Sequence, residues 1–469
     1  MENSLADLPF DCLLHIFSFL LGEELNEAAS VCKAWHRAAE TPWLWREMCL
    51  QRWGFCNVAQ FLSTIKKKSW KAYYLRRSQL ERNMESSADY TCQTLRAHAG
   101  SIVGFVYLSG SDALSEFWNH RSVVCSASSD GTLRAWDIQQ AVQLWSSPAQ
   151  APLRAVTVDP ENKVVITSDD VGTVRAWEGL TGQEVASFSS GSPRNLLHSY
   201  NIGGSSYLAI GTGSGSLHTL TSPALSKLSS CVVFDSFSLN IIHSSPDKKW
   251  IFTGSKDNVD LSPEVFLIQT LCSSEERAVS TRLPVSGCTA AAFLPSHPAR
   301  VAVVHGDGSS QSKTLSVFDV VMKRARYDDE PSVQQVETFK LALNRFQSDI
   351  FLEAKGSNTL VLAVGDELKV YTVKGALVAS FKEHQQHITS LCVDSFRVVT
   401  ASRDLSLRVL TWRNDGEKGL TLESRYHLLG GSHTMSRGFS HVACDYASIV
   451  GSVESVNGKD ALKAYTFNS

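Results

Sequence analysis

The sequence predicts a mostly β fold: a β-propeller of eight, or alternatively seven, four-stranded blades, preceded by a small all-α module and a helical linker. Three observations support this prediction. Apolar residues follow a helical period up to about residue 82. From residue 91, short β-branched and aromatic runs alternate with Gly, Ser, Asp and Pro. One short motif also recurs there at a nearly constant interval. We expect the all-α module at 1–54, the linker at 55–90 and the propeller at 91–469.

Composition excludes several classes of function. The 469 residues carry 44 basic and 47 acidic side chains, and this near-neutral balance disfavours nucleic-acid binding, which needs a basic surface. No run approaches the roughly 18 apolar residues of a membrane helix, and the first residues lack the basic segment of a secretory signal. We therefore expect neither a membrane nor a nucleic acid as a partner.

Cysteine usage indicates a reducing compartment. The eleven cysteines are an odd number, and no two have C-x-x-C spacing, which disfavours both a disulfide framework and a zinc site. We expect a protein of the cytoplasm, the nucleus or both, without a cofactor or a bound metal.

The first predicted helix has an apolar stripe that runs through Leu13, Ile16, Phe17, Leu20 and Leu21. Gly22 closes this helix, and a second stripe follows. The second stripe consists of Leu25, Ala28, Cys32 and Trp35. Thr41-Pro42 predicts another helix, since Thr is a favoured N-cap and Pro a favoured first helical residue.

Residues 63–82 hold seven basic residues against a single acidic one, Glu81. The basic residues are Lys66, Lys67, Lys68, Lys71, Arg76, Arg77 and Arg82. The favoured interpretation is the solvated face of a connecting helix, since charge runs are usually that. The alternative is a surface that docks a partner or a nucleic acid.

A five-residue pattern ending in a bulky residue occurs eight times, first as Thr132–Trp136 and next as Thr173–Trp177. The bulky positions are 136, 177, 220, 266, 318, 371, 410 and 465. Their mean spacing is about 47 residues, close to the roughly 40–45 of a four-stranded propeller blade. The chain ends just after the eighth copy, and residues 91–96 form a strand without a blade of its own. We expect this strand to complete the last blade and so close the ring.

The blade pattern resembles the WD40 repeat. His98, Ser126, Asp130 and Trp136 stand where that family places a buried hydrogen-bond relay, and Asp137 completes the Trp-Asp pair. The resemblance implies that these side chains are structural and not catalytic, since a buried polar relay is tolerated only when every group is paired. Residues 222–345 depart most from the pattern, which leaves seven blades as the alternative.

The N-terminal segment resembles an F-box in the order and spacing of Leu8-Pro9, Ile16-Phe17, Val31-Cys32 and Trp35. The resemblance implies contact with the adaptor Skp1. The implied contact residues are Leu8, Pro9, Leu13, Ile16, Phe17, Leu20, Leu25, Val31, Cys32 and Trp35. The alternative is that these side chains simply pack on the following helices. Fewer than about 50 residues rarely bury a core alone, which favours an interface.

Together the two resemblances identify the chain as similar to the F-box/WD40-repeat family, and residues 244–250 and 444–450 resemble one mammalian group within it. The resemblance implies a non-catalytic substrate receptor of an SCF ubiquitin ligase, joined through Skp1 to a cullin-RING assembly. The alternatives are a Skp1-binding scaffold without a degraded substrate and a propeller hydrolase. The sequence contains no H-E-x-x-H, P-loop or G-x-S-x-G motif, which disfavours the hydrolase.

In relatives that bind phosphorylated targets, arginines occupy the start of the first strand and the turn after the second. Arg154 matches the first position and Arg403 the second, with Arg194 and Lys256 as plausible neighbours. Arginine suits phosphate because its planar fork donates paired hydrogen bonds. The resemblance therefore implies a protein substrate that could carry phosphate, although Arg154 and Arg403 fall on different blades.

Overall fold

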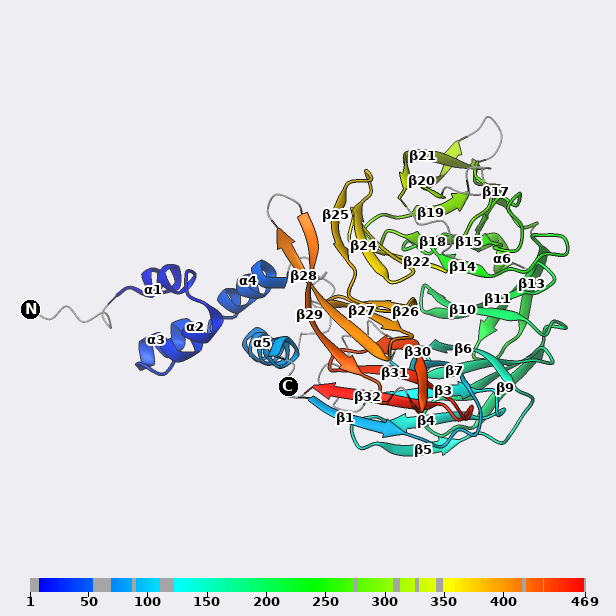
Figure 1. Ribbon diagram of the computed structural model, residues 1–469. Helices are drawn as coiled ribbons and strands as arrows, with labels where there is room; N and C mark the ends of the chain where they lie inside the picture. The colour runs from blue at the N-terminus through cyan, green and yellow to red at the C-terminus, as the bar shows by residue number, and fades with distance from the viewer. Residues whose placement is uncertain are drawn as a thin grey trace, which may run out of the picture. The chain divides into compact units, whose positions relative to one another are not determined.

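The computed structural model describes residues 8–53, 69–86, 90–109, 122–273, 277–306, 313–324, 329–342, 349–415, 419–432 and 434–467. Contacts divide the chain into two compact units, the first formed chiefly by residues 1–91 and the second chiefly by the rest. The first unit is helical and the second is built almost entirely of β-sheet (Figure 1).

The described part of the helical unit, residues 8–53 and 69–86, contains five helices. They are α1 (Phe10–Phe17), α2 (Gly22–Ala28), α3 (Lys33–Ala39), α4 (Pro42–Trp53) and α5 (Trp70–Ser86). Helix α1 packs on α3, where the Phe17 and Trp35 rings meet edge to face with centroids 5.3 Å apart. Helix α5 packs on α2 and α4. A Cβ at Gly22 would lie 2.0 Å from the Tyr74 ring, so the absence of a side chain at residue 22 is what admits this contact.

The basic linker helix is not simply a solvated face. Arg77 is almost fully buried, donates a hydrogen bond to the Tyr73 hydroxyl at 2.6 Å and places its guanidinium 4.3 Å from the Trp53 ring centroid. Lys71 and Arg82 form ion pairs with Glu40 and Glu23 of the earlier helices. The solvated-face prediction is therefore wrong for the buried Arg77, whereas Lys71 is partly exposed and Arg82 is exposed. Lys66, Lys67 and Lys68 lie outside the described residues.

The second unit comprises eight four-stranded antiparallel blades. Blade 1 is β2 (Ile102–Tyr107), β3 (Val123–Ser128), β4 (Leu133–Asp137) and β5 (Val142–Ser146). Blade 2 is β6 (Leu153–Asp159), β7 (Val164–Asp169), β8 (Thr173–Glu178) and β9 (Glu184–Ser189). Blade 3 is β10 (Asn195–Ile202), β11 (Ser205–Thr212), β12 (Ser216–Ser222) and β13 (Lys227–Val232). Blade 4 is β14 (Ile241–Ser244), β15 (Trp250–Gly254), β16 (Glu264–Leu267) and β17 (Ser280–Arg282), with the short α6 (Ile268–Leu271) after β16.

The remaining blades follow the same order. Blade 5 is β18 (Ala290–Phe293), β19 (Arg300–Gly306), β20 (Lys313–Arg324) and β21 (Asp329–Leu341). Blade 6 is β22 (Ile350–Lys355), β23 (Thr359–Val364), β24 (Glu367–Thr372) and β25 (Leu377–Phe381). Blade 7 is β26 (Ile388–Val393), β27 (Arg397–Ser402), β28 (Ser406–Asp415) and β29 (Gly419–Leu429). Blade 8 is β30 (Ser436–Cys444), β31 (Ser448–Ser455), β32 (Ala461–Phe467) and β1 (Tyr90–Leu95).

The ring closes as the sequence predicted. Strand β1 pairs with β32 in blade 8, and the Tyr90 ring meets Tyr465 and Phe467 at centroid distances of 5.9 and 5.8 Å. The first strands of consecutive blades contact one another around the whole circle, from β2 to β30 and back to β2. All eight copies of the five-residue pattern fall on the third strand of a blade, so the count of eight is confirmed and the alternative of seven is wrong.

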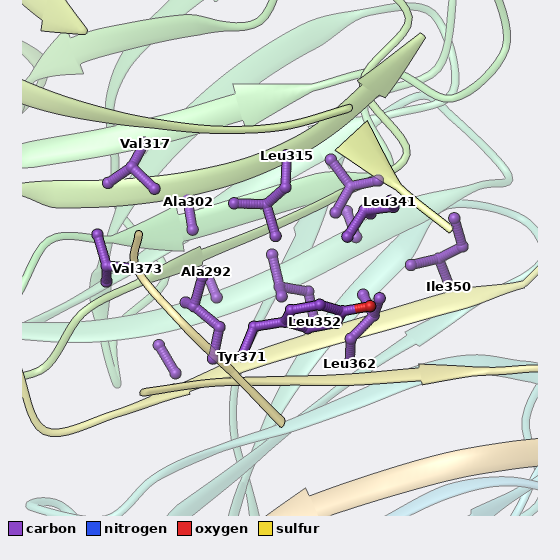
Figure 2. Close-up of a cluster of buried hydrophobic side chains, with 14 of the residues drawn as sticks. Ala292, Ala302, Leu315, Val317, Leu341, Ile350, Leu352, Leu362, Tyr371 and Val373 are labelled. Carbon is purple, nitrogen blue, oxygen red and sulfur yellow. The ribbon is translucent and has the colours of Figure 1, made fainter. Parts of the chain in front are cut away.

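Adjacent blades pack face to face through apolar side chains. Figure 2 shows one such layer, in which Leu315 and Val317 of blade 5 meet Leu352, Leu362 and Tyr371 of blade 6. The second and third strands supply most of each layer because both faces of a blade are covered by its neighbours. This packing fixes the loops at the blade ends, where polar side chains collect.

Candidate functional site

The helical unit exposes large apolar side chains around the turns that join its first three helices. Ile16, Phe19, Leu21 and Val31 are between 42% and 76% exposed, and we call these four residues the apolar surface. Ile16 lies on α1, Phe19 and Leu21 on the turn to α2, and Val31 just before α3. Large exposed apolar groups in such a small unit indicate an interface with another protein.

The ten residues predicted to contact an adaptor fall into three groups. Leu13, Phe17 and Leu25 are buried inside the unit and form its own core, which corrects the prediction that all ten face a partner. The physical reason is that a stripe along one helix side must first bury its central residues against neighbouring helices. Half-buried residues are Leu8, Leu20, Cys32 and Trp35, and exposed residues are Pro9, Ile16 and Val31.

The sequence missed Phe19 as a candidate, and it placed Leu21 on the wrong element. Helix α1 ends at Phe17, and the Ser18 hydroxyl donates to the His15 carbonyl at 2.6 Å. Leu21 instead precedes α2, where its backbone N–H donates to the Glu24 carboxylate at 2.8 Å. The signal available in the sequence was Glu24, since a Glu in the first turn of a helix can accept a hydrogen bond from the backbone N–H of the residue before the helix.

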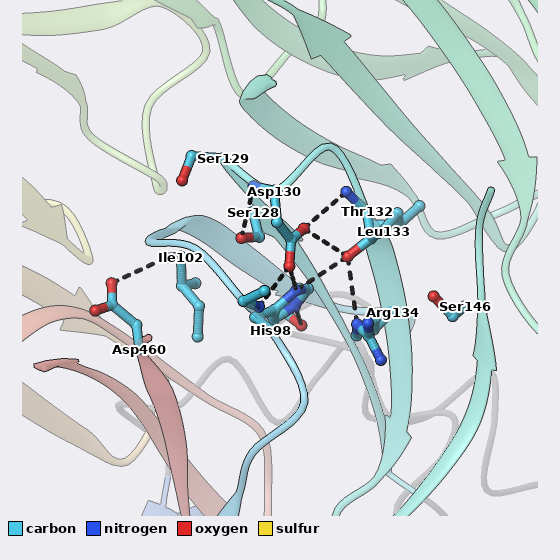
Figure 3. Close-up of polar contacts among 12 residues, drawn as sticks. His98, Ile102, Ser128, Ser129, Asp130, Thr132, Leu133, Arg134, Ser146 and Asp460 are labelled. Atoms are coloured by element: carbon cyan, nitrogen blue, oxygen red, sulfur yellow. Dashed lines mark hydrogen bonds and ion pairs between the residues drawn. The ribbon is translucent and has the colours of Figure 1, made fainter. Parts of the chain in front are cut away.

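In blade 1 the predicted relay is present, and Figure 3 shows its His98, Asp130 and Thr132 side chains. His98 Nε2 lies 2.8 Å from Ser126 Oγ, and the Trp136 indole donates to the same oxygen at 2.9 Å. His98 Nδ1 lies 3.3 Å from Asp130, whose carboxylate also accepts from the Thr132 hydroxyl. Burial lowers the pKa of His98. Burial opposes charge on Asp130 as well, but hydrogen bonds from Thr132 and Ala99 outweigh it and lower the pKa of Asp130 to about 2.

Blade 7 contains a second relay. His384 Nδ1 lies 2.9 Å from Asp404, and its Nε2 lies 2.8 Å from the Thr400 hydroxyl. Leu410 stands where the pattern would have tryptophan. Since both ring nitrogens of His384 already have partners, this side chain is committed to holding the blade together. Within the described residues, no group of three potential ligands is placed to hold a metal ion.

A charged cleft of about 640 Å³ lies across the ends of blades 2, 3 and 4. Its lining residues are Arg154, Asp170, Pro193, Arg194, Asn195, Leu196, Gly213, Ser238, Leu239, Asn240 and Asp257. Arg154 and Asp170 form a long ion pair of 3.9 Å. The cleft thus gathers two arginines and two aspartates from loops that are remote in sequence.

The structure separates the four cations predicted to bind a substrate. Arg154 and Arg194 line the same cleft. The Lys256 backbone N–H donates to Asn240 Oδ1 at 2.6 Å, next to the cleft, but its ammonium does not line it and instead acts on His243 and Cys288. Arg403 of blade 7 forms an ion pair with Glu454 of blade 8. Arg403 is therefore not part of the group around Arg154.

Comparisons with known proteins bear on both units. A sequence model of the family described as F-box-like matches residues 5–51. F-box/WD repeat-containing protein 12 of Homo sapiens is 29% identical over 480 aligned residues that span 100% of both chains. F-box/WD repeat-containing protein 15 of Mus musculus is 26% identical and covers 98% of each chain.

Over its full length the chain is similar to F-box/WD repeat-containing proteins.

Solved structures that resemble this chain support its propeller fold. The computationally designed protein Ika8 has a TM-score of 0.58 at 18% identity and covers 80% of this chain and 98% of its own. The Dos1 propeller has a TM-score of 0.57 at 12% identity, over 80% of this chain and 94% of its own.

No described helix has both the length and the apolar character that a membrane crossing requires. All ten described cysteines are free thiols. Burial raises the pKa of several of them, and Cys49 reaches about 12. A thiol held in its neutral form is a poor nucleophile, so these buried cysteines are structural residues.

Proposed function

We propose that this protein is the substrate-recognition subunit of an SCF ubiquitin ligase. The F-box binds Skp1, Skp1 joins the chain to a cullin-RING assembly, and the propeller holds a target protein. The observation that carries the proposal is the pairing, in one chain, of a helical unit that exposes Ile16, Phe19, Leu21 and Val31 with a closed eight-bladed propeller that presents a charged cleft.

The apolar surface supports adaptor binding energetically. Burying a large apolar side chain contributes about 1.5–3 kcal/mol, so four such residues supply a substantial part of a stable association. Leu13, Phe17 and Leu25 contribute indirectly, since their packing holds α1, α2 and α3 in the arrangement that presents the exposed residues.

In this role the chain is not an enzyme. It holds a target lysine near a ubiquitin-loaded enzyme of the assembly, and the rate gain comes from raised effective concentration and orientation. The histidines that would be the first candidates for catalysis are His98 and His384. Both are already hydrogen-bonded within their blades. The proposed location is the cytoplasm, the nucleus or both, where the other subunits would be encountered.

Co-purification with Skp1 tests the proposal. Ile16→Ser/Val31→Ser changes two exposed residues of the apolar surface, so the helical core is expected to stay folded. Val142→Ser/Val185→Ser is the matched control, because both positions are similarly exposed on the propeller. We expect the first variant to lose Skp1 and the control to retain it. Full Skp1 capture by Ile16→Ser/Val31→Ser would refute the assigned interface.

A Skp1-binding scaffold without a degraded target is the second candidate. The observation that favours it is the departure of several blades from the repeat pattern, such as Leu410 in place of tryptophan in blade 7. Protein turnover measured across the proteome, with wild type and Ile16→Ser/Val31→Ser compared, separates the two. A target stabilised by the variant supports the receptor, whereas unchanged turnover of every protein supports the scaffold.

A further inference from the structure

The charged cleft has a composition that points to one class of target segment, an inference that rests on the proposed receptor function. Blade 2 contributes Arg154 and Asp170, blade 3 contributes Arg194, and blade 4 contributes Asp257. The two positive and two negative charges balance. A cleft built only to hold phosphate would instead concentrate arginine.

Arg194 supplies the donors. Within the described residues its guanidinium makes no hydrogen bond, although its charge acts on Asp257. Arginine carries five N–H donors in a planar fork, and leaving them unused beside a cleft favours an acceptor from outside the chain. Asp257 is already occupied on the protein side, since it accepts from the Ser238 backbone N–H at 2.9 Å and from the Asn240 amide at 3.0 Å.

The backbone around Arg194 is held in place. Its carbonyl accepts from the Gly213 N–H at 2.7 Å and from the Ser192 hydroxyl at 3.1 Å. The buried Asn195 amide donates to Ser168 Oγ at 2.9 Å and to the Ser192 carbonyl at 3.0 Å, which ties the loop of blade 3 to blade 2. A site on a fixed backbone binds without first ordering a loop.

Gly213 keeps space beside Arg194. A Cβ at residue 213 would lie 3.1 Å from the Arg194 Cβ and 3.3 Å from the Ser192 hydroxyl. A side chain there would press on the arginine and narrow the cleft. The bare backbone of Gly213 therefore leaves the arginine side chain room to meet a ligand.

Asp170 and Asp257 decide which anion fits. A phosphate carries nearly two negative charges and is repelled by neighbouring carboxylates, whereas a single carboxylate meets half that repulsion. The Arg154–Asp170 pair is long and exposed, with the arginine side chain 57% accessible, so it contributes little by itself and both partners are available to a ligand.

We propose that the cleft across blades 2, 3 and 4 binds an unphosphorylated target segment that carries both an acidic and a basic side chain. The acidic side chain of the target accepts hydrogen bonds from Arg194, assisted by Arg154. The basic side chain of the target pairs with Asp170. Recognition of this kind needs no prior modification of the target.

Retention of defined peptides by the full-length protein tests the proposal. The probes are bead-displayed ten-residue libraries of four kinds, with Asp and Lys together, Asp alone, Lys alone, or phosphoserine alone as the charged residues. We expect the library with both charges to be retained best. Arg194→Gln should lower that retention about tenfold, the change expected for one lost charge-assisted hydrogen bond. On Asp170→Asn, the library with both Asp and Lys should be retained no better than the library with Asp alone. Retention of the Asp-only library should be the same on this variant as on wild type.

The matched control is Arg413→Gln, an exposed arginine of blade 7 away from the cleft, which should leave every retention unchanged. Best retention of the phosphoserine library would overturn the proposal. Retention that Arg194→Gln and Asp170→Asn leave unaltered would also overturn it, as would the absence of retention of any library above beads alone.

Skp1 capture is measured on the same samples. Intact Skp1 capture without the predicted retention refutes only this inference, whereas loss of Skp1 capture counts against the ligase function.

Discussion

Arg77 places its guanidinium 4.3 Å from the ring centroid of Trp53, and the arginine is only 1% exposed. The most basic stretch of the chain thus contributes a charged side chain to the core of the helical unit. Glu81, one turn further along α5, lies 3.5 Å from the same guanidinium and also accepts a hydrogen bond from the Trp53 indole at 2.5 Å. The buried charge is therefore compensated by a carboxylate and two aromatic rings.

Arg77→Ala should destabilise the helical unit by about 3 kcal/mol, since it leaves the Tyr73 hydroxyl without its donor and a cavity beside Trp53. Arg82→Ala is the control. Its ion pair with Glu23 is half exposed on both sides, so its removal should cost less than about 1 kcal/mol. Chemical unfolding followed by tryptophan fluorescence measures both. Equal losses for the two variants would contradict the structural role of Arg77.

Gly22→Ala should cost about 1–3 kcal/mol in the same unit, because the new methyl group would occupy the space of the Tyr74 ring and push α5 from α2. Gly306→Ala is a suitable comparison, since among the described residues no atom beyond its chain neighbours lies within 4 Å of the added Cβ. Thermal unfolding should show a lower midpoint for the first variant only. Wild-type stability of Gly22→Ala would show that α2 and α5 do not pack as described.

The relay of blade 1 predicts loss of stability in acid. The pKa of Asp130 is about 2 in the folded chain against 3.8 normally, so the unfolded chain takes up its proton first as the pH falls. The contribution of ionised Asp130 to the free energy of unfolding is therefore complete above about pH 4 and disappears towards pH 2. The lowered pKa of His98 adds a loss of the same sign that begins near pH 6.5. Unfolding free energies of Asp130→Asn, measured from pH 7 to 3, should depend less on pH than those of wild type. An unchanged slope would exclude the relay as its source.

Glu353 should make the stability of the folded chain depend on pH in the opposite direction, with stability falling as the pH rises. It lies on β22 in the inner ring of strands, and although part of its side chain is exposed, desolvation of the carboxylate by the surrounding strands raises its pKa to about 7. The unfolded chain loses this proton near pH 4.5, so the cost to the folded state grows between pH 4.5 and 7 and is complete above pH 7.

Glu353→Gln should therefore raise the unfolding temperature at pH 8 and change it little at pH 4. Glu161→Gln, in the exposed turn of blade 2 between β6 and β7, serves as the control and should behave alike at both pH values. Differential scanning calorimetry at the two pH values measures the effect. A stabilisation of equal size at pH 4 and pH 8 would rule out titration of Glu353 as the cause.

Local sequence patterns were sufficient for the propeller. The eight third strands, the closing strand near residues 91–96 and the relay from His98 to Trp136 were all predictable, because they follow from short-range alternation of apolar residues and from turn residues that recur along the chain. Each copy of the five-residue pattern marks the third strand of one blade, so the number of copies equals the number of blades. The order of the N-terminal motif likewise predicts the helical unit.

Only the tertiary structure decided which side chains are available for binding. Leu13 and Ile16 belong to the same helical stripe, yet one is buried and the other exposed, because exposure depends on where the neighbouring helices lie. Arg154 and Arg194 line one cleft while Arg403 pairs with Glu454 in another part of the ring. The position of a residue within a repeat predicts that it lies at the end of a blade. Which loops from different blades lie close together, and which of their charges pair, depends on how the blades pack around the ring.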